Sequence, residues 1–243
     1  MDRLIYLSMS GAKASMQRQD VLTHNLANAS TNGFRAELAA FRAVPVLGDG
    51  ATTRAFALET TLGYDARSGP VAPTGNPLDV AMKGNAWLAV QALDGTEAYT
   101  RAGALQINAE GLVVTGAGLP VLGDGGPITL PTGALPEVAG DGTITAKVGN
   151  ARPQAVGRLK LVTPEAALIR GADGLFRAAE GDLPADATAQ LQSGALEGSN
   201  VSPIETMVAM ISAARQFEHQ MKMLQGAEQR EQAAAKLLGP VGG

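Results

Sequence analysis

The sequence predicts a mainly β protein, with an antiparallel β middle domain between an N-terminal and a C-terminal α-helix that pair as a coiled coil on assembly. Apolar residues recur at intervals of three and four in residues 1–30 and again after residue 199, as on one face of a helix. Between these regions, short runs of Val, Leu, Ile and Thr alternate with Asp-Gly, Glu-Gly and Gly-Gly turns. Thirty Gly and 13 Pro in 243 residues fit a chain with many turns.

Residues 1–30 are predicted to form the N-terminal helix. Its apolar face consists of Ile5, Met9, Ala12, Met16, Leu22 and Leu26. Gly11 weakens this helix by about 1 kcal/mol relative to Ala. The turn-forming stretch NASTNG, which starts at Asn28, then ends the helical pattern.

Residues 31–64 are predicted to be an extended connector, because strand patterns are sparse around residues 48–75. Residues 65–198 are predicted to form the β-rich middle domain. The expected strands lie in the runs PLDVAM, AWLAVQAL, EAYTRAG, LQINAEGLVVT, LPVLG, GPITLP, GTITA, GRLKLV, ALIRGADGLFRA and ALEGSN. Their short, regular spacing favours antiparallel meanders or a sandwich.

Residues 199–243 are predicted to hold a long helix with well-marked ends. Ser202, Pro203 and Glu205 fit a capping box that starts it, with Ser at the N-cap, Pro at N1 and Glu at N3. Gly239 and Pro240 would end it after Leu238. Such a helix would be roughly 54 Å long at about 1.5 Å per residue.

The apolar residues of the C-terminal helix fit a heptad. Met207, Ala214 and Met221 occupy one position of the seam, and Met210, Phe217 and Leu224 occupy the other. The N-terminal helix is the one candidate partner within the chain, and it is shorter. Apolar surface should therefore remain uncovered, which predicts contacts with other chains.

Composition and motifs argue against several classes of function. The net charge of −4 disfavours nucleic-acid binding, and the chain has no Cys for disulfides or thiolate metal sites. The first residues contain no apolar run of a cleavable signal peptide, and no membrane span is expected. His24 and His219 are interpreted as surface residues, although a metal pair across the two helices stays an alternative. Sequence patterns of known catalytic sites and phosphate-binding loops are missing, so we predict no catalytic residue, cofactor, metal or small-molecule substrate.

Two terminal motifs resemble the paired signatures of bacterial flagellar basal-body rod and hook proteins. The N-terminal pattern falls on Asn25, Leu26, Ala27, Asn28, Thr31, Gly33 and Phe34. The C-terminal pattern falls on Leu196, Glu197, Ser199, Asn200, Val201, Met207, Arg215, Phe217 and Glu218. The stretch from TGNPLDVAM through DGTITA to GRLKLV, together with the opening MDRLIY, is most similar to a proximal-rod member of that family.

This resemblance implies a structural subunit of the proximal rod, the drive shaft that crosses the periplasm and transmits torque. It implies that the subunit polymerises through its terminal helices with copies of itself and with other rod proteins. It also implies delivery by the flagellar type III export apparatus without cleavage of a signal peptide. The expected assembly interface consists of Ile5, Met9, Met16, Leu22, Asn25, Leu26, Asn28, Gly33, Phe34, Asn200, Met207, Met210, Phe217, Met221 and Leu224.

Other functions stay open at this stage. The chain could be another axial protein of the same family, from the distal rod or the hook. A peptidoglycan-cleaving domain would need two carboxylates about 5–9.5 Å apart across a cleft, and Asp79, Asp94 and Glu97 are available. A peptidoglycan-binding domain would usually expose aromatic side chains, of which the chain has few.

Overall fold

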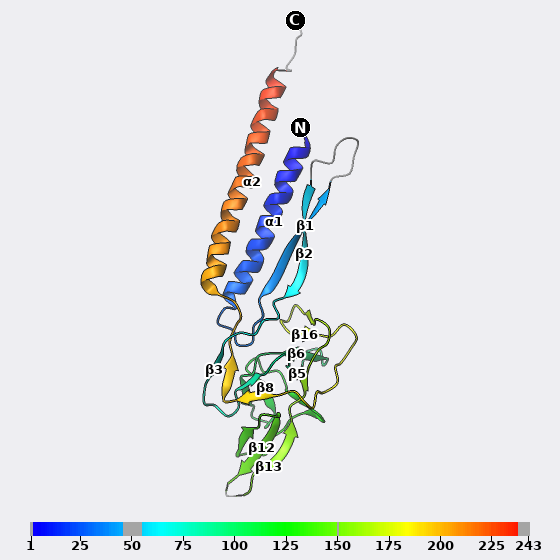
Figure 1. The fold of residues 1–243 in the computed structure, drawn as a ribbon, viewed down its shortest axis with the longest axis vertical. Coiled ribbons are helices and arrows are strands. Elements are labelled where there is room, and N and C mark those ends of the chain that lie inside the picture. The colour runs from blue at the N-terminus through cyan, green and yellow to red at the C-terminus, as the bar shows by residue number, and fades with distance from the viewer. Residues whose placement is uncertain (1, 46–54, 150, 238–243) are drawn as a thin grey trace. The chain divides into compact units, whose positions relative to one another are not determined.

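The computed structural model describes residues 2–45, 55–149 and 151–237, and these residues form two α-helices and eighteen β-strands (Figure 1). The helices are α1 (Asp2–Ala27) and α2 (Pro203–Leu237). The strands are β1 (Glu37–Pro45), β2 (Ala55–Tyr64), β3 (Val71–Pro73), β4 (Val80–Met82), β5 (Trp87–Gln91), β6 (Glu97–Thr100), β7 (Leu105–Ile107), β8 (Val113–Thr115), β9 (Leu122–Gly123), β10 (Gly126–Pro127), β11 (Ala134–Val138), β12 (Thr143–Val148), β13 (Gln154–Arg158), β14 (Leu161–Val162), β15 (Ile169–Arg170), β16 (Phe176–Arg177), β17 (Leu191–Ser193) and β18 (Ala195–Glu197).

The chain folds into two compact units, each built from segments that are distant in sequence. The helical unit comprises Met1–Ala27, Glu37–Gly63 and Val201–Gly243. The middle unit comprises Asn28–Ala36 and Tyr64–Asn200. The chain therefore enters the middle unit, returns to the helical unit through β1 and β2, and then enters the middle unit again.

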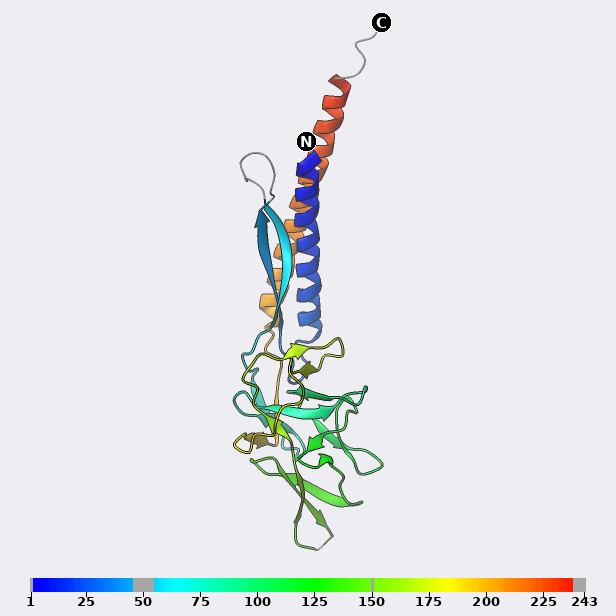
Figure 2. The ribbon, with the colours of Figure 1, turned by 90° about the vertical axis from the view of Figure 1, so that its right-hand side faces the viewer.

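In the helical unit, α1 and α2 lie side by side (Figures 1 and 2). The start of α2 agrees with the expected cap, since the Glu205 N–H donates to Ser202 Oγ at 3.4 Å. The Thr206 N–H donates to the Ser202 carbonyl at 3.0 Å. The expected C-terminal residues of this helix, Leu238, Gly239 and Pro240, lie outside the described residues.

The connector expected over residues 31–64 is wrong for much of its length. Strands β1 and β2 form a two-stranded sheet, and β1 contacts α1. The buried Asn25 amide fixes the start of β1, because its Oδ1 accepts the Glu37 N–H at 2.8 Å and its Nδ2 donates to the Glu37 carbonyl at 3.0 Å. Both backbone polar groups of Glu37 thereby gain a hydrogen-bond partner.

The middle unit is a set of small antiparallel sheets, as the sequence predicts. The largest has five strands in the order β14-β5-β6-β16-β15, and β11-β12-β13 form a three-stranded sheet. The pairs β7-β8, β9-β10, β4-β17 and β3-β18 complete it. The last two pairs bring residues 191–197 against residues 71–82, so the C-terminal end of the unit lies beside its early strands.

Strand β5 separates two apolar clusters. Leu88 and Val90 belong to the larger cluster, and Trp87 and Ala89 belong to the smaller one. Both faces of β5 are therefore buried, which explains its uninterrupted apolar sequence. The smaller cluster is aromatic: the Tyr64 ring meets the Trp87 ring edge-on, with ring centroids 5.8 Å apart.

Candidate assembly surface and the Glu197 clamp

The two helices pack through small side chains. On α1 the buried positions include Ser8, Ala12 and Ser15, which are spaced by four and three residues. The Gln220 side chain of α2 crosses α1 at Gly11, where a Cβ would lie 2.8 Å from Gln220 Cδ. Small residues at these positions allow the two backbones to approach closely.

The face of α2 that packs is offset from the expected heptad. Met210, Phe217 and Leu224 are half-buried, in keeping with one seam position. At the other position the buried residues are Thr206 and Ala213, each one residue before the expected Met207 and Ala214. The expected Met221 is half-buried, and Met207 is 50% exposed.

A second apolar face runs along the first turns of α2. Its residues, Ile204, Met207, Val208 and Ile211, are each at least half exposed. Positions i, i+3, i+4 and i+7 share one side of a helix. Ile211 and Ala213 differ by about 200° around the axis at 3.6 residues per turn, so this outer face lies opposite the buried seam.

The apolar residues expected on α1 divide in the same way. Met9 is 62% exposed and Met16 is 54% exposed, whereas Ile5, Leu22 and Leu26 are half-buried. Met9 and Met16 are seven residues apart and therefore share one side of α1, and apolar residues gathered on one exposed side are typical of an interaction site. The outer face of α2 and the exposed methionines of α1 are therefore the candidate assembly surface.

The remaining expected residues belong to turns and junctions. Asn25 binds the backbone of Glu37 as described above. Asn28 ends the helical stretch, because its Oδ1 accepts the Thr31 hydroxyl at 3.2 Å and its carbonyl accepts the Thr31 N–H at 3.1 Å. These two residues act on the local backbone and present no apolar surface.

Gly33, Phe34 and Asn200 meet inside the middle unit. The Gly33 N–H donates to the Glu197 carbonyl at 2.8 Å, and the Asn200 N–H donates to the Phe34 carbonyl at 3.3 Å. The buried Phe34 ring lies under the Arg170 guanidinium, whose Cζ is 4.6 Å from the ring centroid. Sequence motifs at opposite ends of the chain thus form one junction.

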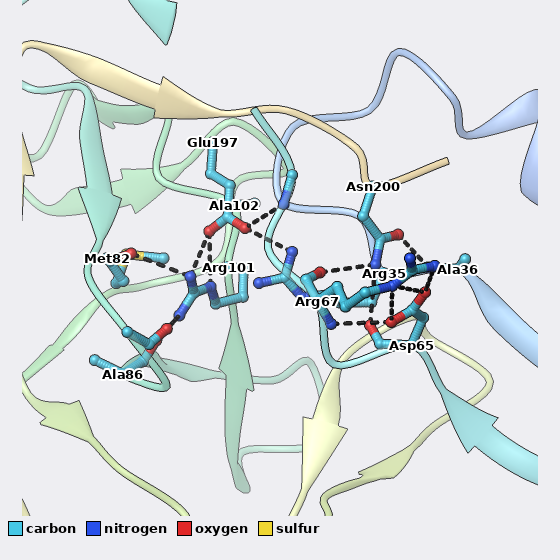
Figure 3. Close-up of polar contacts among 12 residues, drawn as sticks. Arg35, Ala36, Asp65, Arg67, Met82, Ala86, Arg101, Ala102, Glu197 and Asn200 are labelled. Atoms are coloured by element: carbon cyan, nitrogen blue, oxygen red, sulfur yellow. Dashed lines mark hydrogen bonds and ion pairs between the residues drawn. The ribbon is translucent and has the colours of Figure 1, made fainter. Parts of the chain in front are cut away.

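The Asn200 amide ties three segments together (Figure 3). Its Oδ1 accepts the Ala36 N–H at 2.7 Å, and its Nδ2 donates to the carbonyls of Asp65 and Arg67 at 3.0 and 2.8 Å. The bridge uses three of the hydrogen bonds that an amide can make. Asn200 therefore fixes the backbone at the edge of the middle unit. This role depends on contacts within the chain and needs no contact with another chain.

Beside this junction, one carboxylate is buried between two guanidiniums (Figure 3). We call this group the Glu197 clamp; its four residues are Glu197, Arg35, Arg101 and Gly69. Glu197 Oε1 accepts Arg35 Nη1 at 2.5 Å and the Gly69 N–H at 3.0 Å. Glu197 Oε2 accepts Arg101 Nε at 2.8 Å and lies 2.6 Å from Arg101 Nη2. Charge-assisted bonds of this kind are among the strongest in proteins.

Arg101 also holds the loop that leads into β5. Its Nη1 donates to the carbonyls of Gly84, at 2.9 Å, and Ala86, and its Nη2 donates to the Met82 carbonyl at 3.1 Å. Burial lowers the pKa of the Arg101 guanidinium below its usual value, and the charge of Glu197 opposes that effect. The buried guanidinium therefore depends on the Glu197 carboxylate.

Asp65 lies close to the clamp but binds elsewhere. The Arg67 guanidinium grips both of its carboxylate oxygens, with Nε–Oδ2 and Nη2–Oδ2 distances of 2.9 and 2.6 Å and an Nε–Oδ1 distance of 3.1 Å. This side-chain hydrogen bonding is the main cause that lowers the pKa of Asp65, and the charge of Arg35 adds a smaller effect. Asp65 is thus committed to Arg67.

Residues 2–45, 55–149 and 151–237 contain no group of three or more His, Cys, Asp or Glu side chains placed to hold a metal ion. His24 Nδ1 lies 3.2 Å from Glu37 Oε2. Neither helix, over its described length, combines the length and the apolar character that a membrane crossing requires.

Three family profiles match successive parts of the chain. "Flagella basal body rod protein" matches residues 5–35, "Flagellar hook protein FlgE/F/G D1 domain" matches residues 81–146, and "Flagellar basal body rod FlgEFG protein C-terminal" matches residues 192–237. The first and last matches contain the two halves of the junction around Glu197. The middle match runs from within β4 to within β12.

Curated relatives match over nearly their whole length. The chain is 46% identical to flagellar basal-body rod protein FlgF of Salmonella typhimurium, with 98% of this chain and 99% of the relative covered. It is 44% identical to FlgF of Escherichia coli K12 over the same shares of both chains, and 34% identical to FlgF of Caulobacter vibrioides over 99% and 100%. The chain therefore belongs to the flagellar basal-body rod protein family.

Proposed function

We propose that this chain is a structural subunit of the proximal rod and that it polymerises through α1 and α2 into the shaft that transmits torque. The observation that carries the proposal is the outer face of α2, where Ile204, Met207, Val208 and Ile211 are exposed although α1 already covers the opposite side. Burying apolar surface is the main driving force of protein association. A helix with two apolar faces suits a position between neighbours on both sides.

The expected partners are copies of this chain and other rod proteins. The outer face of α2 differs from the surfaces of α1 in its residues, so a contact between them would be heterologous. Heterologous contacts that do not close into a ring generate helical filaments, which is the form of a shaft. We expect the terminal helices of neighbouring subunits to pack as a coiled coil in that filament.

Identity to relatives supports the proximal type of rod protein. FlgF relatives reach 34–46% identity in Salmonella, E. coli and Caulobacter, whereas FlgG of Agrobacterium fabrum is 28% identical. On the same basis we expect a periplasm-spanning location, delivery by the flagellar export apparatus without signal cleavage, and a role without catalysis or cofactor.

The test replaces exposed apolar residues of the outer face by a charge. Met207→Glu and Ile211→Glu should leave the subunit folded, because both side chains are at least half exposed, yet they should prevent its incorporation into rods. The measurements are swimming of a complemented deletion strain and the amount of subunit in purified basal bodies. Circular dichroism of the purified variants checks folding.

Gln216→Glu is the matched control, since Gln216 is an exposed polar residue of the same helix, outside the outer face. It adds the same charge and should swim like the wild type. Normal swimming and normal rod content of the Met207→Glu and Ile211→Glu strains would refute assembly through this face.

A further inference from the structure

The clamp holds more positive than negative charge in a buried place. The side chains of Arg35 and Arg101 are each 2% exposed and that of Glu197 is 0% exposed. Within the described residues, Glu197 is the one carboxylate in an ion pair with either arginine, and Arg35 Nε is buried without a hydrogen-bond partner. Removing the carboxylate would leave two guanidiniums buried without their ion-pair partner, which is strongly unfavourable.

The carboxylate comes late in the chain. Arg35 precedes Glu197 by 162 residues and Arg101 precedes it by 96. Gly69 and the carbonyls that bind Arg101 also come earlier. Strand β18, which carries Glu197, closes the unit by pairing with β3, and β17 pairs with β4. Every other part of the clamp is therefore present in the chain before its counter-charge.

We propose that Glu197 gates the folding of the middle unit. Before Glu197 arrives, Arg35, Arg101 and the Gly69 N–H form an open site for a carboxylate, and the unit reaches its final packing only when that site is filled. In a chain that emerges N-terminus first, the unit stays open until residue 197 is free. This inference concerns the middle unit alone and does not depend on the proposed assembly through the helices.

The geometry selects a planar carboxylate. The donors come from three segments and divide between two oxygens, with Arg35 and Gly69 on Oε1 and Arg101 on Oε2. A carboxylate offers each arginine its own oxygen, whereas a spherical anion offers one point of contact. Formate should therefore substitute for a missing Glu197 side chain better than chloride does.

The experiment uses the full-length chain with Glu197→Ala, which reproduces the state before the carboxylate arrives. Trp87 is the single tryptophan of the sequence and lies beside Arg101, whose Cζ is 5.9 Å from the ring centroid, so its fluorescence follows this unit. In chloride the Tm should fall by on the order of 10 °C. Formate at the same ionic strength should recover at least half of that loss, rising with concentration as for a bound ligand.

Two further variants make the result decisive. Glu110→Ala removes an exposed glutamate of the same unit and should keep the wild-type Tm in both salts. Glu197→Gln keeps the shape without the charge, so its Tm should fall and formate should not restore it, because the amide fills the site.

Four outcomes would overturn the proposal. One is a Tm of Glu197→Gln or Glu197→Ala within about 2 °C of the wild type. Another is an equal effect of formate on Glu110→Ala and Glu197→Ala. A third is recovery of Glu197→Gln by formate. The last is a Glu197→Ala chain that is unfolded in chloride and that formate does not refold; refolding by formate would support the gate.

Discussion

Gly33 lies at the closest backbone contact of the junction. Its φ of 70° is in the left-handed region, and a Cβ there would lie 2.2 Å from the carbonyl carbon of Arg101. Its N–H donates to the Glu197 carbonyl. Glycine is needed for the conformation and for the space, because the obstacle is backbone that cannot rotate away.

We expect Gly33→Ala to destabilise the middle unit by about 2–5 kcal/mol. This is the sum of the cost of placing alanine in the left-handed conformation and the cost of overpacking the contact with Arg101. Gly118→Ala is the control, since Gly118 has a φ of 81° with nothing within 4 Å of a Cβ. It should cost only about 1–2 kcal/mol. Urea unfolding followed by Trp87 fluorescence measures both, and equal costs would show that the contact with Arg101 is unimportant.

Single residues of the junction differ in how far the sequence predicts them. Gly33, Phe34 and Asn200 belong to recognisable motifs, although the sequence suggested an interface between chains and the structure gives them partners within one. Arg35 and Arg101 carry no local pattern. Their partner Glu197 is 162 and 96 residues away, and a buried ion pair between distant residues leaves no periodicity in the sequence.

At the scale of elements, the start of α2 was predicted better than the faces of the helices. The cap at Ser202 depends on a few adjacent residues, and the structure has it. The expected seam favoured large apolar residues such as Met207, but the packed positions are the smaller Thr206 and Ala213. Close approach of two helices selects for small side chains, and hydrophobicity alone does not indicate this.

The strands β1 and β2 were missed although part of their pattern is visible. Phe56, Leu58, Leu62 and Tyr64 alternate with other residues along β2, as in a half-buried strand. In the middle unit, turn residues bracket most of the apolar runs, and strands were found there. Turn residues also lie at the limits of β1 and β2, where Pro45 ends β1 and Gly63 comes next to last in β2. The alternation within β2 was therefore the signal that was overlooked.

Gly11 provides a test of the helix contact. Gly11→Ala should gain up to about 1 kcal/mol of helix propensity, reduced by the need to move the flexible end of Gln220. Gly226→Ala, with open space around its Cβ, should gain the full amount. Thermal unfolding followed by circular dichroism at 222 nm compares the two variants.

A second substitution isolates the role of Gln220. In a Gln220→Ala background, Gly11→Ala should stabilise the helical unit as much as Gly226→Ala does, and the difference between the backgrounds is the coupling energy of the contact. If Gly11→Ala gains equally with and without Gln220, the two side chains do not meet.

At the scale of the whole molecule, the chain passes between its two units more than once. Residues 28–36 belong to the middle unit although residues 37–63 belong to the helical unit. The first of these segments is held by hydrogen bonds from Gly33 to Glu197 and from Ala36 to Asn200, and by the ion pair of Arg35. The expectation of a middle domain limited to residues 65–198 omits this segment. A domain predicted as one continuous range cannot include a segment that joins it only through contacts between residues distant in sequence.

Limited proteolysis with subtilisin should show this non-contiguous organisation. A two-stranded sheet is marginally stable by itself, so cleavage within residues 37–63 should separate residues 28–36 from the rest of the middle unit without releasing them. Native mass spectrometry should find the segment bound to a fragment that begins near Tyr64 and ends near Asn200, and denaturing mass spectrometry should find the two pieces apart. Glu197→Ala should release the segment during the same digestion, because Arg35 then loses its ion-pair partner. If residues 28–36 dissociate from the wild-type core in native buffer, the clamp does not bind this segment to the rest of the middle unit.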